Sequence, residues 1–203
     1  MYMYSLVLQR SRILLFALAL PAFGGSIQGI KNFHQVDQHV YRGAQPSDEG
    51  FASLAKMGVK TIIDLREPGD RSQHEQNAVI AAGMKYLNVP MTRLTPPSGS
   101  EITKILGLLE DGSTGPVFVH CMRGADRTGA VIAAYRIDHD SWDNNRALNE
   151  AKAMGMSFFQ FPRKSFIEGF QARAVEARST AVTATAPAPG AEVVDSNVSV
   201  TRP

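Results

Sequence analysis

The chain has 203 residues, of which 44% are hydrophobic, which suits one globular domain with terminal extensions. Two of its 21 basic residues and none of its 19 acidic residues lie within residues 1–25, so the remainder carries 19 charges of each sign. This balance leaves no net positive field of the kind that nucleic-acid-binding or anionic-membrane-binding proteins carry.

Residues 1–25 have the pattern of a secretory signal peptide. Arg10 and Arg12 precede an apolar run at residues 13–23, and small residues follow it. The run is shorter than the roughly 20 residues that span a bilayer, and Pro21 interrupts it. We therefore predict export to the periplasm or out of the cell, with cleavage and no membrane span in the mature chain. The alternatives are an uncleaved anchor and an amphipathic N-terminal helix.

After an irregular lead-in at residues 27–37, apolar strands are predicted to alternate with helices. Strands are predicted at residues 40–42, 60–65, 85–89 and 117–119. Helices are predicted at residues 48–57, 72–82, 128–138, 141–154 and 164–178, and from a cap at Ser98 or Ser100 through Leu109. This alternation predicts an α/β fold with three layers, in which helices cover both faces of a central, mainly parallel sheet of four to five strands.

We assign residues 26–178 to one domain. Residues 179–203 are rich in Ala, Thr, Val, Pro and Gly without an amphipathic period, and they are predicted to form a disordered tail. The apolar side chains of the late helices are expected in the core, namely Leu148, Ala151, Phe158, Phe159, Phe166 and Phe170.

The segment 117–129 (VFVHCMRGADRTG) has the features of a catalytic loop. An apolar strand leads into Cys121, a short loop follows, and Arg127 then opens a helix. Backbone N–H groups of a tight loop before a helix, together with the positive end of the helix dipole, cradle a phosphate-sized dianion. A thiol at the base of this cradle has its pKa lowered from about 8.5 to about 4–6. Cys121 is therefore the predicted nucleophile, and it needs no separate general base.

The residues around Cys121 suit phosphate transfer. Arg127 offers a planar fork that grips two phosphate oxygens and stabilises charge in the transition state. The Thr128 hydroxyl can donate to the sulfur, and His120 is expected beneath the loop, where its hydrogen bonds fix the loop's shape. The predicted phosphate-binding residues are Met122, Arg123, Gly124, Ala125, Asp126 and Arg127. Cys121 is also the only cysteine, so no second thiol can trap it as a disulfide.

Residues 120–129 (HCMRGADRTG) resemble the signature loop of the protein tyrosine and dual-specificity phosphatase superfamily. The stretches 40–47 (VYRGAQPS) and 61–66 (TIIDLR), and the helical segments 133–137 and 142–155, are similar to the compact atypical dual-specificity phosphatases of plants, fungi and bacteria. The resemblance covers about residues 33–170. It implies a dual-specificity phosphatase-like fold and a metal-independent phosphomonoester hydrolase that forms a phosphocysteine intermediate.

The chain differs from this superfamily at the residue that would protonate the leaving group. Much of the superfamily uses an aspartate on a loop upstream of the cysteine, but the matching stretch 89–96 (VPMTRLTP) contains no carboxylate. Myotubularin-type lipid phosphatases resemble this chain in carrying an aspartate at the position of Asp126, which implies an acid there. A carboxylate beside a bound phosphate dianion is favoured in its protonated form. The alternatives are that Asp126 caps the helix or pairs with Arg127 or Arg123.

Asp64 and Glu67 come at the carboxyl end of a strand, where the sites of parallel sheets gather, and Arg66 can reach the same rim. An ion pair between Asp64 and a neighbouring arginine that organises the loop is the preferred interpretation. The other four histidines are scattered without ligand spacing. We therefore expect neither a metal nor a cofactor.

The substrate class stays open at this stage between phosphotyrosine-like aryl phosphates, inositol phosphates or pyrophosphates, and small phosphomonoesters. The expected partner is thus a phosphorylated substrate and not a nucleic acid, and a monomer is expected. The competing hypotheses are a phosphate-binding pseudophosphatase, which the missing upstream acid favours, and a rhodanese-like sulfurtransferase, whose loop length and closing residues differ.

Overall fold

The computed structural model describes residues 27–173. The predicted signal peptide at residues 1–25 and the predicted tail at residues 179–203 lie outside the described residues. Within residues 27–173, no helix combines the length and the apolar character that crossing a membrane requires.

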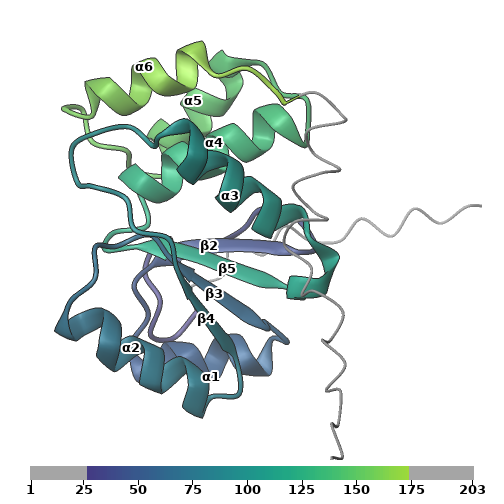
Figure 1. Cartoon of the computed structure of the whole chain (residues 1–203), viewed down its shortest axis with the longest axis vertical. Helices are drawn as coiled ribbons and strands as arrows, with labels where there is room; N and C mark the ends of the chain where they lie inside the picture. The colour runs from purple at the N-terminus through teal and green to yellow at the C-terminus, as the bar shows by residue number, and fades with distance from the viewer. Residues whose placement is uncertain (1–26, 174–203) are drawn as a thin grey trace, which may run out of the picture.

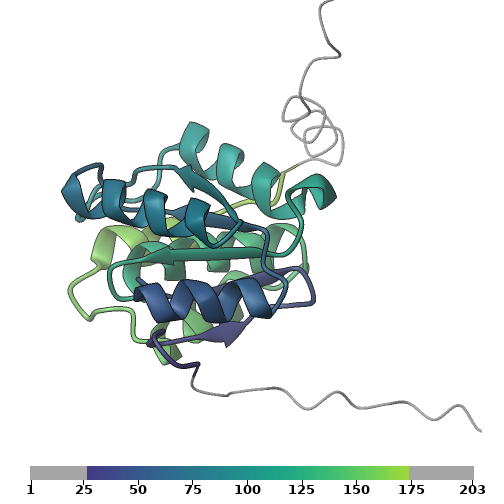
Figure 2. The ribbon, with the colours of Figure 1, turned by 90° about the horizontal axis from the view of Figure 1, so that it is seen from below.

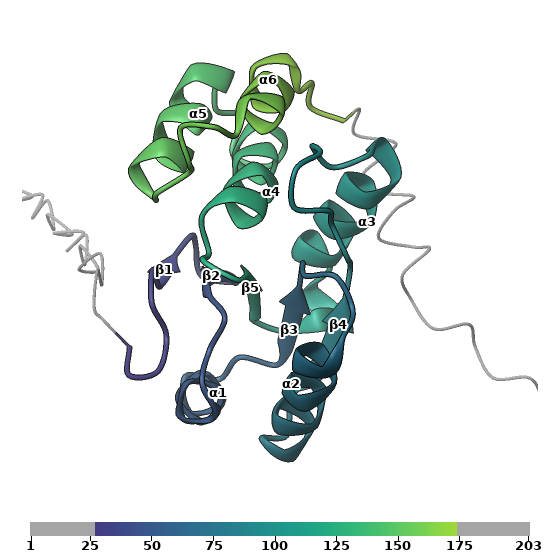
Figure 3. The same ribbon diagram turned by 90° about the vertical axis from the view of Figure 1, so that its left-hand side faces the viewer.

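One sheet of five strands runs through the centre of the fold in the order β1-β2-β5-β3-β4. The strands are β1 (His34–Gln35), β2 (Val40–Ala44), β3 (Thr61–Asp64), β4 (Lys85–Asn88) and β5 (Val117–Cys121). Strands β2, β5, β3 and β4 run parallel, and β1 pairs antiparallel with β2 at one edge (Figure 3). The predicted mainly parallel sheet is therefore confirmed.

Within the described residues, six α-helices cover the two faces of this sheet, so the predicted three-layer architecture is confirmed (Figures 1 and 2). Helices α1 (Asp48–Lys56) and α2 (Asp70–Ala81) lie on one face. The other face carries α3 (Gly99–Glu110), α4 (Asp126–Asp138), α5 (Asn144–Ala153) and α6 (Phe161–Gly169). A short 3₁₀ helix, η1 (Gly112–Thr114), leads into β5.

The core consists of one apolar cluster on each face of the sheet and a third between α4, α5 and α6. Strand β5 is buried along its whole length, because it lies between β2 and β3 and has helices above and below it. Burial on both faces explains why its sequence is continuously apolar before the polar end at His120 and Cys121. The strand that ends in the candidate nucleophile is thus enclosed on both faces and both edges.

The start of α3 settles an alternative that the sequence leaves open. The Ser98 hydroxyl accepts a hydrogen bond from Glu101 N at 3.2 Å, and Glu101 Oε2 accepts one from Ser98 N at 2.6 Å. Ser98, rather than Ser100, is therefore the N-cap, and this reciprocal arrangement satisfies two backbone donors at the helix end.

The lead-in at residues 27–37 is predicted to be irregular, but it contains β1. His34 pairs with Arg42 and Gln35 pairs with Tyr41. A strand of two residues is too short to show the alternation that identifies a strand in a sequence. Its existence depends on the edge that β2 offers, which is a tertiary property.

The last helix differs from the prediction of residues 164–178, because α6 begins at Phe161 and ends at Gly169. Phe170 has extended backbone angles, with φ −67° and ψ 135°. Asn144 Nδ2 donates to the carbonyl oxygens of Ile167 at 2.7 Å and Phe170 at 2.8 Å. These bonds satisfy carbonyls at the helix end, and they favour termination there.

Two of the six predicted core residues of the late helices are exposed, so the prediction is wrong for them. Phe158 is 70% exposed and Phe159 is 80% exposed, because both lie in the turn between α5 and α6 rather than on a helix face. Leu148 and Ala151 are buried as predicted. The remaining pair, Phe166 and Phe170, is partly buried against the apolar clusters.

Candidate active site

The candidate site lies where β5 ends and α4 begins. Cys121 is the last residue of β5, and α4 starts at Asp126, two residues earlier than predicted. Residues 121–127, which we call the phosphate loop, therefore run from the last residue of a buried strand into the first turn of a 13-residue helix. This is the predicted strand–loop–helix arrangement, in which backbone N–H groups and the helix dipole favour an anion.

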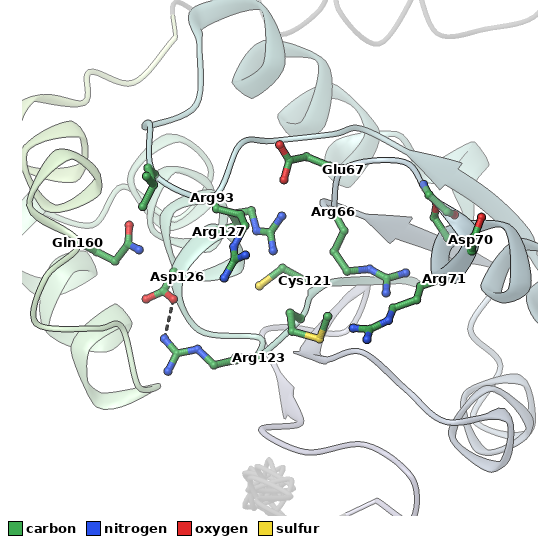
Figure 4. Close-up of a pocket in the computed structure, with 14 residues that line it drawn as sticks. Arg66, Glu67, Asp70, Arg71, Arg93, Cys121, Arg123, Asp126, Arg127 and Gln160 are labelled. Carbon is green, nitrogen blue, oxygen red and sulfur yellow. Dashed lines mark hydrogen bonds and ion pairs between the residues drawn. The ribbon is translucent and has the colours of Figure 1, made fainter.

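A cavity of about 620 Å³ opens above the phosphate loop, with Cys121 at its base (Figure 4). The phosphate loop contributes Cys121, Met122, Arg123, Asp126 and Arg127 to its wall. The remaining wall comes from the segment after β3, from the segment between β4 and α3, and from the residue before α6, namely Arg66, Glu67, Gly69, Asp70, Arg71, Ser72, Arg93, Leu94 and Gln160.

The Cys121 thiol is 3% exposed and has a pKa below its ordinary value. Burial by itself raises the pKa of a thiol, but the Thr128 hydroxyl and N–H, the Arg127 charge and the Arg123 N–H together outweigh it. The Thr128 hydroxyl is buried and has no well-aligned hydrogen-bond partner among the described residues, yet it lies close enough to the sulfur to stabilise the thiolate. A thiol with a lowered pKa is the reactive form of cysteine.

Arg127 holds its guanidinium beside the sulfur (Figure 4). The side chain is buried, and Nη1 donates to the carbonyl oxygens of Leu65 at 3.3 Å and Met91 at 3.2 Å. These two bonds orient the planar group while its remaining face lines the cavity. The geometry therefore suits the predicted grip on phosphate oxygens.

Asp126 lies in the first turn of α4 and lines the cavity. Its Oδ2 accepts a hydrogen bond from Arg123 Nη2 at 2.6 Å, and its Oδ1 accepts one from Ser157 N at 2.8 Å. The N-cap position of α4 is Ala125, so Asp126 does not cap this helix. Of the alternatives considered for Asp126, the ion pair with Arg123 is present, and its position in the cavity wall is compatible with an acid.

Beneath the loop, Asp64 and Arg66 form the predicted ion pair, which is confirmed. Arg66 Nε donates to Asp64 Oδ1 at 2.9 Å, and its Nη2 is 2.8 Å from Asp64 Oδ2. Arg66 also contacts Glu75 of α2, and Tyr86 donates to Asp64 Oδ2 at 2.8 Å. Because both carboxylates are buried, these donors are what make their ionised forms tolerable.

His120 is fully buried beside this ion pair. Its Nε2 is 2.6 Å from Glu75 Oε1, while Nδ1 is 3.4 Å from the Cys121 carbonyl oxygen. Burial lowers the pKa of His120, but the Glu75 hydrogen bond and the Glu75 and Asp64 charges outweigh it and raise the pKa. His120 therefore contacts both the start of the phosphate loop, at the Cys121 carbonyl, and Glu75 of α2, which is its shorter contact.

The ligand atoms of Asp64, Glu75 and His120 lie within 4.8 Å of one another, which resembles a metal site in composition. The carboxylate oxygens, however, already accept hydrogen bonds from Arg66, Tyr86 and His120. The cluster is therefore a hydrogen-bonded network of paired charges that supports the floor of the site.

Several site residues escape prediction from the sequence. Glu75 is 1% exposed, and its helical spacing with buried Ser72 and Val79 is the signal that could have placed it against the sheet. Arg71 and Arg93 line the cavity from segments distant in the chain. No local pattern marks these two arginines, because their proximity to Cys121 follows from the strand order.

Comparisons with known proteins agree with this geometry. Residues 25–169 match the model of a family described as DSP-PTPase phosphatase fused to NAD⁺ kinase. Dual specificity protein phosphatase TpbA of Pseudomonas aeruginosa PAO1 is 30% identical over 136 residues, which cover 66% of this chain and 60% of TpbA. The chain therefore spans less than two thirds of the length of that relative.

A yeast protein shows the same relationship in sequence and structure. Inositol diphosphatase SIW14 of Saccharomyces cerevisiae is 30% identical over 111 residues, covering 52% of this chain and 39% of SIW14. The crystal structure of its core catalytic domain, in complex with citrate, matches with a TM-score of 0.68 and 25% identity over 78% of this chain and 96% of that domain. The chain has relatives in bacteria and fungi. It therefore belongs to the dual-specificity-type protein tyrosine phosphatases, in the family whose description is DSP-PTPase phosphatase fused to NAD⁺ kinase.

Proposed function

We propose that this protein is a phosphomonoester hydrolase that works through a phosphocysteine intermediate and needs no metal. The observation that carries the proposal is the buried Cys121 thiol of lowered pKa, which ends β5, precedes the loop into the N-terminus of α4 and lies beside the Arg127 guanidinium. The membership of the family and the names of the relatives support the same reaction class.

In the first step the Cys121 thiolate attacks phosphorus in line with the leaving oxygen. The S–P bond forms while the P–O bond to the leaving group breaks, and an acid in the cavity wall gives that oxygen a proton. The phosphate-loop N–H groups and the Arg127 guanidinium hold the other phosphate oxygens as charge develops on them. The lowered pKa of Cys121 lets this step begin without a base.

In the second step water attacks the phosphorus of phosphocysteine. The carboxylate that gave its proton in the first step accepts one from this water, so the acid returns to its starting form. The S–P bond breaks, inorganic phosphate forms, and the electron pair returns to the Cys121 sulfur. The buried Thr128 hydroxyl close to the sulfur stabilises the departing thiolate.

The cavity wall contains the carboxylates of Glu67, Asp70 and Asp126, and we consider Asp126 and Glu67 for the role of the acid. Asp126 belongs to the phosphate loop, but both of its oxygens already accept hydrogen bonds, from Arg123 and from Ser157. Glu67 is exposed, points into the cavity and has no hydrogen bond or ion pair with any other described residue (Figure 4). We propose Asp126 as the acid because it lies in the loop itself, with Glu67 as the alternative that its free carboxylate favours.

For the substrate, the cavity favours a compound with a second phosphate. Arg71 and Arg93 are exposed in the cavity wall, and neither guanidinium has a partner among the described residues. Two unpaired cations beside a phosphate cradle fit an additional anionic group of the substrate. We therefore propose inositol phosphates, including diphosphates, as the substrate class, in line with the name of SIW14. Phosphotyrosine in proteins is the competing class, which the dual-specificity name of TpbA supports.

The first experiment is hydrolysis of p-nitrophenyl phosphate by the purified chain in EDTA, with Cys121→Ser as the control. Turnover that resists EDTA and disappears in Cys121→Ser supports the proposed reaction. A wild-type chain that binds vanadate but releases no product is the result expected of a phosphate-binding pseudophosphatase. If the chain instead transfers sulfur from thiosulfate to cyanide and releases sulfite, it is a sulfurtransferase.

We also propose that the protein is exported, as the pattern of residues 1–25 predicts. A single cysteine suits an oxidising compartment, because it cannot form a disulfide within the chain. N-terminal sequencing of the protein from fractionated cells tests this proposal. An intact residue 1 in the cytoplasmic fraction is the outcome that contradicts it.

A further inference from the structure

The phosphate loop is held from its outer side by the side chain of Asn32. Asn32 Nδ2 lies 3.3 Å from the carbonyl oxygen of Arg123 and 3.1 Å from that of Gly124. The same nitrogen is 3.0 Å from the carbonyl oxygen of Met154, at the end of α5. His34 Nε2 is 3.2 Å from Asn32 Oδ1 and orients the amide. One amide thus links the lead-in, the loop and α5, and it does not line the catalytic cavity.

Arg42 reaches the same part of the loop from β2. Its Nη2 donates to the Gly124 carbonyl oxygen at 2.7 Å. The side chain is 1% exposed, and its Nε and Nη1 have no hydrogen-bond partner among the described residues. A buried guanidinium with unpaired donors destabilises a fold. Its presence in the middle of a strand therefore calls for a function that offsets this cost.

The contact between the loop and β2 leaves no room for adjustment. Gly124 has a φ of +67°, and a Cβ at this position would lie 2.2 Å from the Gly43 carbonyl carbon. Only glycine combines this backbone angle with such a close approach. The loop therefore rests directly on the backbone of β2, next to the strand position from which Arg42 donates.

The direction of the carbonyl groups decides the direction of the N–H groups. In a planar trans peptide the C=O and the following N–H point to opposite sides. Outward carbonyls at Arg123 and Gly124 therefore turn the N–H groups of Gly124 and Ala125 toward the side of the cavity. These N–H groups belong to the cradle that the proposed function requires.

We propose that Asn32 and Arg42 are positioning residues, which hold the Arg123 and Gly124 carbonyls outward so that the loop N–H groups face the Cys121 sulfur and the bound phosphate. The inference rests on the proposed function of the loop as a phosphate cradle. Neither side chain touches the substrate, so both act through the loop.

Charge adds to this role of Arg42. Burial lowers the pKa of Arg42 to about 10, against the opposing effect of Glu150 and Cys121, so the guanidinium stays charged at neutral pH. The charged groups that act on Cys121 thus include Arg42 behind the loop and Arg127 in front of it. Loss of Arg42 removes both a hydrogen bond to the loop and a cation near the thiolate.

The test uses the single cysteine of the chain. The rate of alkylation of Cys121 by iodoacetamide, measured against pH, gives the pKa of the thiol without any need for turnover. We expect this pKa to rise by about one unit in Asn32→Gly and in Arg42→Met. Glycine is chosen at position 32 because Asn32 has a positive φ of 52°, which glycine adopts without strain. Vanadate affinity should fall about tenfold in both variants. Arg42→Lys keeps the charge and should restore part of each effect.

A matched control separates positioning from simple stability. Asn144 also donates two hydrogen bonds to backbone carbonyls, at α6 and away from the loop. Asn144→Ala should lower the melting temperature but leave the Cys121 pKa and the vanadate affinity unchanged. If Asn32→Gly and Arg42→Met melt earlier yet keep the wild-type pKa and affinity, both residues are structural only and the proposal is wrong. If the wild-type chain hydrolyses no phosphate ester, the proposed function is wrong instead. The alkylation measurement does not depend on turnover, so it still tests the positioning role.

Discussion

Arg123 Nη2 donates to Asp126 Oδ2 at 2.6 Å, and the same nitrogen donates to Ser157 Oγ at 2.6 Å. The single arginine between Cys121 and Arg127 is therefore engaged with a carboxylate at the mouth of the cavity. These contacts make Arg123 less available to bind a second anionic group of a substrate. Positive charge for a second phosphate has to come from outside the phosphate loop, and Arg71 and Arg93 are in place to supply it.

The first prediction concerns the acid. If Asp126 protonates the leaving group, Asp126→Asn should lower kcat on an alkyl phosphate by about 10²- to 10⁴-fold and should have a smaller effect on p-nitrophenyl phosphate, because a good leaving group needs no proton. Glu67→Gln should then retain most of the activity. The measurement is kcat for both variants on the two substrates.

The opposite pattern assigns the acid to Glu67, whose carboxylate is free in the cavity. Arg123→Gln serves as the matched control, because it removes the partner of Asp126 while it leaves both carboxylates in place. Equal losses on both substrates in Asp126→Asn would indicate a distorted loop, which would contradict an acid role for that residue.

A second prediction concerns substrate choice. Arg71→Ser and Arg93→Ser should each raise KM for an inositol diphosphate about 10- to 100-fold, since a charge-assisted hydrogen bond to phosphate contributes roughly 1.5–3 kcal/mol. KM for p-nitrophenyl phosphate should change little. Kinetics at two salt concentrations provide the check, because the loss should shrink as salt screens the charge. Equal KM increases for both compounds would argue against a second phosphate subsite.

A third prediction follows from the raised pKa of His120. Its ordinary value is 6.5, and the folded value lies above it. A group with a higher pKa in the folded state stabilises the fold fully below its unfolded pKa, and this contribution disappears as the pH rises through the folded value. The unfolding free energy of the wild type relative to His120→Gln should therefore be greatest below about pH 6.5 and should shrink at higher pH.

Urea titrations of both proteins between about pH 5 and pH 9 measure this difference. Glu75→Gln removes the main acceptor of His120 and should flatten the same pH dependence. Parallel curves for wild type and His120→Gln would show that the imidazole keeps one protonation state over this range.

The fourth prediction tests the exposure of the aromatic turn. Phe158 and Phe159 lie outside the core, so Phe158→Ser and Phe159→Ser should change the unfolding free energy by about 0.5 kcal/mol or less. Leu148→Ala, in the cluster between α4, α5 and α6, should cost about 2–5 kcal/mol. Denaturant titrations of the three variants measure these changes in unfolding free energy. A loss from Phe159→Ser comparable to that from Leu148→Ala would place this ring in the core.

The parts of the site that depend on neighbours in the chain follow from the sequence. A continuously apolar run predicts β5, and a helix is predicted directly after it. Cys121 ends that strand, and Arg127 and Thr128 lie in the first turn of the helix α4. Within so few residues, backbone geometry alone brings these side chains together. The order of strands and helices likewise predicts the parallel sheet, because connections between parallel strands need a crossover helix.

Only the tertiary structure decides which distant residues complete the site. His120 meets Glu75 across 45 residues of chain, and Arg42 meets Gly124 across 82. The strand order, in which β5 lies between β2 and β3, creates these pairs, and no local period encodes that order. The exposure of Phe158 is also a tertiary property. Spacing along the chain shows which residues could share a helix face, but the packing of α5 against α6 decides where α5 ends and α6 begins, and Phe158 lies between them.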